Sequence, residues 1–146
     1  MLQLNIMKAF LFSLLLLGLW ASAGCGHLDL AATNDAERIL TGFVTNPNGG
    51  ELPPDTEVTI RIVDYSRGEE RGETLGEQVI QNPGRFPVPI RIEYRAEDAV
   101  LMRRVNVEAR ISVGGRLRYA TSSGHPITLH NVNDSHFVQV DLVGRR

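Results

Sequence analysis

The sequence predicts an all-β domain, an antiparallel β-sandwich of seven to eight short strands, and three observations support it. From residue 37 onward, several segments alternate between hydrophobic and polar residues, as strands with one buried face do. Clusters of Gly, Pro and Asn separate these segments at short intervals. No segment carries a convincing 3.6-residue hydrophobic period. Closely spaced strands without helices are typical of sandwiches and barrels.

Residues 1–24 have the features of an export signal. Lys8 precedes a run of twelve mostly apolar residues, 9–20, which is too short to span a bilayer core of about 30 Å. A cation, a short apolar run and small residues before a cleavage site are typical of a secretory signal peptide. Met7 and Lys8 would also make a normal signal start, so the sequence leaves open whether translation begins at Met1 or Met7.

Cys25 is the one cysteine of the chain, and it follows the small residues 21–24 (ASAG). This arrangement resembles the lipobox of bacterial lipoproteins, in which the cysteine is lipidated and becomes the first residue. Ser22 departs from the leucine that is usual at its position, three before the cysteine. Gly26, in place of aspartate, favours sorting to the outer membrane by resemblance to enterobacterial lipoproteins. The alternative is cleavage after Ala23, which would give a soluble periplasmic protein with an unpaired thiol.

Residues 25–36 are predicted to be the lipidated cysteine and a tether, because residues 26–36 (GHLDLAATNDA) show no strand alternation. The β-sandwich domain is predicted to occupy residues 37–146. A domain of this size can bury roughly two-thirds of its unfolded surface, which is enough for stability without disulfides.

The first half of the domain contains three predicted strands. Residues 38–45 alternate and end at the Asn-Pro-Asn-Gly-Gly turn of residues 46–50. Residues 56–63 alternate more clearly, and a charged loop over residues 66–72 separates them from a weaker strand at residues 74–81. In the strand at residues 38–45, Ile39, Thr41 and Phe43 share one side. In the strand at residues 56–63, the predicted inward residues are Val58, Ile60 and Ile62.

Residues 86–94 predict a strand at the edge of a sheet. Five hydrophobic residues share one face, and Pro87 and Pro89 lie on the other. Proline has no N–H to donate to a neighbouring strand, so two prolines place this segment at an edge. A single helical turn is expected within residues 95–101. The predicted inward residues of the strand are Phe86, Val88, Ile90, Ile92 and Tyr94.

The last third of the chain completes the predicted sheets. Residues 104–113 alternate most clearly, and Gly114-Gly115 forms a two-residue hairpin loop that leads into residues 116–121. Residues 127–130 and 137–143 supply the last one or two strands. The predicted inward residues here are Val105, Val107, Ala109, Ile111, Val113, Leu117 and Tyr119.

Composition argues against nucleic acid as a partner. The segment after residue 24 has fourteen arginines, no lysine, and seventeen acidic residues, a balance of about −3. Arginine and glutamate are interleaved, whereas phosphate binding needs clustered cations.

Candidate chemistry is sparse, and the sequence predicts no catalytic residue, cofactor, metal ligand or small-molecule substrate. A zinc site needs three or four convergent ligands, so the four histidines are interpreted as exposed loop residues. The acidic group Glu69, Glu70 and Glu73 is interpreted as a neutral, solvated loop, because Arg67 and Arg71 lie among its residues. The histidines are His27, His125, His130 and His136.

Four segments of the domain resemble the YbaY/YscW family of small lipoproteins. They read TGFV at residues 41–44, LPPDTEVTIRIVDYSR at 52–67, GEQVIQNPGRFPVPIRIEY at 76–94 and VEARISVGGRLRYAT at 107–121. The resemblance implies a β-sandwich similar to immunoglobulin or transthyretin folds, and a lipid attached at Cys25. The YscW-type pilotins of this family chaperone the outer-membrane secretin of type III secretion, and the sequence looks closer to the YbaY branch.

These observations lead to the hypothesis of a non-catalytic lipoprotein that binds or chaperones a secretin-like envelope protein at the periplasmic face of the outer membrane. The edges of a sandwich can accept a strand from a partner. Two alternatives stay open: a structural lipoprotein without a dedicated partner, and a binder or enzyme of envelope lipid or glycan.

Overall fold

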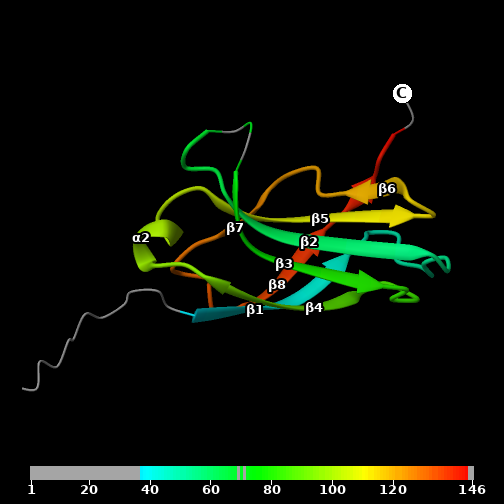
Figure 1. The fold of residues 1–146 in the computed structure, drawn as a ribbon. Helices are drawn as coiled ribbons and strands as arrows, with labels where there is room; N and C mark the ends of the chain where they lie inside the picture. The colour runs from blue at the N-terminus through cyan, green and yellow to red at the C-terminus, as the bar shows by residue number, and fades with distance from the viewer. Residues whose placement is uncertain (1–36, 69, 71, 145–146) are drawn as a thin grey trace, which may run out of the picture. The chain divides into compact units, whose positions relative to one another are not determined.

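The computed structural model describes residues 37–68, 70 and 72–144, which form two β-sheets with a shared hydrophobic core (Figure 1). The smaller sheet has the strand order β4–β1–β8. The larger sheet has the order β3–β2–β5–β6–β9, and β7 pairs with β5 outside this path. The predicted β-sandwich is confirmed.

The strand bounds follow the predicted segments closely in the first two-thirds of the domain. The smaller sheet contains β1 (Glu37–Thr45), β4 (Val88–Arg95) and β8 (Ser135–Gln139). The larger sheet contains β2 (Thr56–Asp64), β3 (Glu73–Gln81), β5 (Val105–Val113), β6 (Arg116–Ala120), β7 (His125–Ile127) and β9 (Asp141–Leu142). The predicted helical turn is α2 (Asp98–Leu101), the one helix within the described ranges.

The core consists of the inward faces that the alternation predicted. On β2, β4 and β5 every second side chain is buried, and these side chains meet between the two sheets. Their neighbours in the chain point outward, because successive residues of a strand face opposite sides. The predicted inward residues that are confirmed as buried include Val58, Ile60, Ile62, Phe86, Val88, Ile90, Ile92, Tyr94, Val105, Val107, Ala109 and Ile111.

The predicted edge strand corresponds to β4, which is the last strand of the smaller sheet, as predicted. It contains Pro89, and Pro87 lies just before its first residue, Val88. Its outer side is not open, however, because β3 of the other sheet runs beside it. The backbone N–H of Arg91 donates to Oε1 of Gln78 at 2.9 Å. A Cβ added at Gly76 would lie 2.8 Å from Cβ of Tyr94, so glycine permits this close approach.

Three details of the C-terminal third differ from the predictions. The described residues contain nine strands, because residues 137–143 divide between β8 and β9 in different sheets. β7 ends at Ile127, where Asn131 begins to organise a turn: its Oδ1 accepts from the Thr128 N–H at 2.7 Å and its Nδ2 donates to the Pro126 carbonyl at 3.0 Å. Leu117 was predicted to face inward but is 45% exposed.

The exposure of Leu117 has a physical cause in the pairing of β5 with β6. The register shifts between Ile111 and Ser112, so one strand carries an extra residue and the alternation of inward and outward positions is interrupted there. Tyr119, beyond the shift, packs edge-on against Phe86 with ring centroids 5.8 Å apart.

The pairing of β1 with β8 is parallel, in contrast to the antiparallel pairs around it. Gly42 of β1 lies opposite His136 of β8, and a Cβ at Gly42 would come within 1.9 Å of the His136 carbonyl oxygen. Only glycine allows the two backbones to approach so closely. The parallel pair therefore depends on Gly42.

Candidate protein-interaction surface

The outward side of the smaller sheet carries an apolar surface that we call the aromatic face, defined by Ile39, Phe43, Pro89 and Phe137. Phe43 of β1 lies opposite Pro89 of β4 on one side and opposite Phe137 of β8 on the other. These three residues therefore form a row across all three strands. Ile39, further along β1, extends the surface toward the start of that strand.

The two aromatic rings of this face are stacked, and the ring of Phe137 is open to solvent while that of Phe43 is half-buried. The ring centroids of Phe43 and Phe137 are 5.8 Å apart with an interplanar angle of 20°. Phe137 is 60% exposed and Ile39 is 48% exposed. Exposed contiguous apolar side chains are costly in water and mark interaction sites, and aromatic residues are enriched in protein interfaces.

Charged side chains border the aromatic face along β4 and at the start of β1. Arg91 and Glu93 pair on β4 at 2.6 Å, and Glu37 of β1 pairs with Arg95 of β4 at 2.9 Å. These exposed pairs contribute little to stability. An apolar centre within a polar rim is the usual anatomy of a protein interface.

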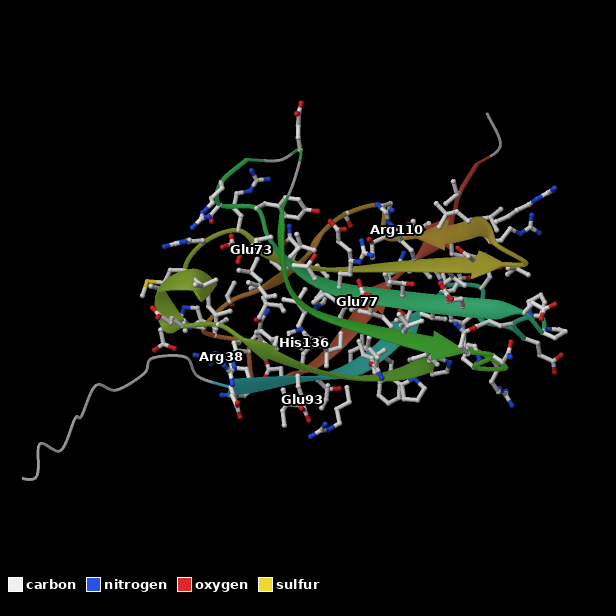
Figure 2. The ribbon with its side chains drawn as sticks, in the orientation of Figure 1. Arg38, Glu73, Glu77, Glu93, Arg110 and His136 are labelled. Atoms are coloured by element: carbon white, nitrogen blue, oxygen red, sulfur yellow. The ribbon has the colours of Figure 1, made fainter. Side chains whose placement is uncertain are left out.

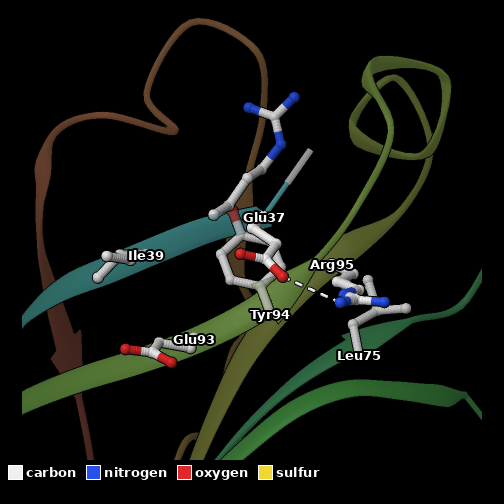
Figure 3. Close-up of a pocket in the computed structure, with 7 residues that line it drawn as sticks. Glu37, Ile39, Leu75, Glu93, Tyr94 and Arg95 are labelled. Carbon is white, nitrogen blue, oxygen red and sulfur yellow. Dashed lines mark hydrogen bonds and ion pairs between the residues drawn. The ribbon is translucent and has the colours of Figure 1, made fainter. Parts of the chain in front are cut away.

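A pocket of about 550 Å³ lies beside Ile39, where β1 begins and β4 ends (Figure 3). The Glu37–Arg95 ion pair lies along it, and Leu75 of β3 contributes an apolar wall. Burial raises the pKa of Tyr94, whose hydroxyl is enclosed without a hydrogen-bond partner. The neighbouring Arg38 lowers that pKa, but to a smaller extent. The pocket extends the aromatic face with a mixed apolar and charged surface.

The free edge of the smaller sheet belongs to β8. Within the described residues β8 pairs only with β1, so the edge away from β1 carries no strand partner. The sequence predicted an edge at residues 86–94, which include β4, whereas β3 runs beside that strand. The exposed ring of Phe137 therefore lies on the strand whose edge is unpaired.

The histidines do not behave as predicted. His136 is buried on β8 (Figure 2), and its Nδ1 lies 2.9 Å from Nε2 of His125. The interpretation of both as exposed loop residues is therefore wrong. His130 is exposed, as predicted, and His27 lies outside the described residues. The alternation of His136 with Val138 and Val140 was the signal that could have placed this histidine inside.

The other residues considered as candidates in the sequence are either exposed or outside the described residues. In the acidic loop, Glu70 and Glu73 are exposed, and Glu69 lies outside the described residues. Within the ranges that the structure covers, no group of three or more His, Cys, Asp or Glu residues could hold a metal ion. Cys25 lies outside the described residues, as does the whole signal segment. No helix in the described ranges is long and apolar enough to cross a membrane.

A second group of exposed apolar side chains lies on β6, on β9 and just after it, at Leu117, Leu142 and Val143. It borders a groove of about 450 Å³ that also includes Arg116 and Arg118. This group has no aromatic ring, and two arginines border it. The aromatic face is the better candidate for protein binding.

Comparison with known proteins identifies the family. Residues 35–140 match the model of the family described as type III secretion system lipoprotein chaperone (YscW). The chain belongs to this family. A solved structure, an alternative pilotin from the type II secretion system of Vibrio cholerae, is similar with a TM-score of 0.65 and 22% identity. The match covers 75% of this chain and 99% of the pilotin chain, and at this identity it shows a shared fold. No curated protein matches the chain.

Proposed function

We propose that this YscW-family protein is a lipoprotein of the outer membrane, anchored through Cys25, whose periplasmic β-sandwich binds a secretin-like envelope protein without catalysing a reaction. The observation that carries the proposal is the exposed ring of Phe137, stacked on the half-buried ring of Phe43 on the smaller sheet. A chaperone must present a surface that recognises another protein, and this stack presents an exposed aromatic ring on the described domain. The family and the pilotin fold both favour a partner from a secretion system.

The physical basis of binding is the removal of the aromatic face from water. Burying apolar surface contributes about 25 cal/mol per Å², and a few central aromatic residues carry most of the energy of a protein interface. The ring of Phe137 is held in place by Phe43 and by the β1–β8 pairing before a partner arrives. A partner therefore meets a preorganised surface and loses less conformational entropy on binding. The unpaired edge of β8 would also accept a strand from the partner.

The test is the double variant Phe43→Ser and Phe137→Ser in a pull-down from detergent-solubilised outer membranes, with the amount of secretin measured by quantitative mass spectrometry. We expect capture of secretin to fall by about tenfold or more, since hot-spot residues contribute about 2 kcal/mol each. The fold should persist, because Phe137 is mostly exposed and Phe43 lies on the outward side of β1, opposite the core residues Leu40 and Val44.

The control is Val79→Ser, which changes an apolar residue that is 48% exposed on β3 of the other sheet. Its capture of secretin should equal that of the unmodified protein. If both variants lose secretin capture to the same extent, the substitutions disturb the whole domain and not the aromatic face in particular. If neither variant loses secretin capture, the proposed binding surface is contradicted. If no secretin is captured at all, the structural-lipoprotein alternative becomes the better account.

A further inference from the structure

His125 and His136 form a contact between the two sheets. His125 lies on β7, which pairs with β5 in the larger sheet, and His136 lies on β8 in the smaller sheet. Their rings meet edge to face, with centroids 5.2 Å apart, an angle of 81° and a nitrogen–nitrogen distance of 2.9 Å. This hydrogen bond ties the edge strand β8 to the opposite sheet.

His136 is shielded from solvent, and one carboxylate acts on it. His136 is 3% exposed, and its Nε2 is buried. The residue opposite His136 on β1 is Gly42, and the residue opposite His125 on β5 is Val107, neither of which titrates. The carboxylate of Asp134, just before β8, is the charged group that acts on His136.

The hydrogen bond between the rings requires that at least one imidazole be neutral. One ring nitrogen donates its N–H, and the facing nitrogen accepts with a lone pair. A first proton places a charge in the buried contact, and a second removes the accepting lone pair and sets two cations against each other. Protonation at acidic pH therefore weakens the contact between β7 and β8 directly.

Burial lowers the pKa of both histidines from the ordinary value of 6.5, and their mutual repulsion lowers that of His125 further. The backbone of Asn131 and the carboxylate of Asp134 raise the pKa of His136, but by less than burial lowers it. Because both pKa values are lowered in the folded state, the unfolded or opened state binds protons first. The contact is thus fully stable above pH 6.5 and loses stability as the pH falls below that value.

We propose that His125 and His136 form an acid-sensitive latch that holds β8 in the sandwich at neutral pH and releases it at acidic pH. Phe137 follows His136 directly, so movement of β8 would separate Phe137 from Phe43 and disrupt the aromatic face. The latch is a property of the domain alone. Its consequence, acid-dependent loss of partner binding, rests on the proposed function.

The test measures amide hydrogen exchange of β8 in the purified full chain at pH 7.5 and pH 5.0, as protection factors that correct for the intrinsic effect of pH. We expect protection in β8 to fall by about tenfold at the lower pH, because protonation favours the opened state of the β7–β8 contact. The double variant His125→Gln and His136→Gln should lose most of this pH dependence. The control His130→Gln changes an exposed histidine. Its β8 protection should depend on pH in the same way as that of the unmodified protein.

If the double variant does not fold, NMR titration of the histidine ring protons in the unmodified protein decides instead. Two rings that titrate below 6.5, together with the loss of protection in β8, support the latch. Protection in β8 that is equal at both pH values would overturn it, as would titration of both rings at 6.5.

A separate measurement distinguishes the latch from the proposed function. Secretin capture at pH 7.5 and 5.0 should fall at the lower pH for the unmodified protein and change little for the double histidine variant. If β8 opens in acid but secretin is not captured at either pH, the latch stands and the proposed function fails. If capture is strong and equal at both pH values while β8 opens, the link between the latch and the aromatic face is wrong.

Discussion

A Cys25→Ala variant should lose its association with the outer membrane almost completely. The lipid on this residue is the proposed anchor, and each buried CH₂ of an acyl chain contributes about 0.8 kcal/mol, so two or three chains hold a protein stably at a membrane. Without the thiol no lipid is added, and the protein should stay unprocessed or appear as soluble material. Fractionation of cells followed by immunoblotting measures this directly.

The intact mass of the membrane-extracted, unmodified protein provides the complementary result. It should correspond to a chain that starts at Cys25 and carries diacylglycerol and acyl groups. Ser22→Ala is the matched control, because it keeps a small residue in the same segment and should leave processing unchanged. A mature chain that starts at Gly24 without lipid would favour the alternative of a soluble periplasmic protein.

A Val107→Asp variant should unfold the domain. Val107 is fully buried in the middle of β5 and faces the core shared by both sheets. An unpaired carboxylate in this position would cost about 4 kcal/mol or more, which is a large part of the 5–15 kcal/mol that stabilises a typical domain. Urea denaturation monitored by far-UV circular dichroism measures the loss.

Arg110→Asn is the control for this variant, because Arg110 is exposed on the same strand and faces solvent. Its effect on the free energy of unfolding should stay within about 0.5 kcal/mol. A Val107→Asp protein as stable as the Arg110→Asn protein would contradict the assignment of the β5 core face.

The fold could be predicted from the sequence where a local pattern determines the structure. Period-two alternation is visible in β2, β4 and β5 because each strand has one buried face, and the prolines placed β4 at an edge because they cannot donate hydrogen bonds. Features that depend on non-local pairing could not be predicted in this way. The register shift that exposes Leu117 is one example, since the alternation of the sequence continues unchanged through it.

The aromatic face depends on a register that no local pattern encodes. Phe43 shares a side of its predicted strand with Ile39 and Thr41, but the alternation alone does not say which side is buried. In the structure Leu40 and Val44 fill the core, and Phe43 faces outward. The parallel pairing of β1 with β8 then brings Phe137 beside it.

The most direct test of the central proposal is site-specific photo-crosslinking in intact cells from a benzoyl-phenylalanine probe in place of Phe137. Probes at Val79 on β3 and at Gly49 in the turn after β1 serve as controls. The proposal predicts that the Phe137 probe captures one secretin-like outer-membrane protein and that the two control probes do not. Equal, diffuse crosslinking from all three positions, or capture from Val79 alone, would contradict it.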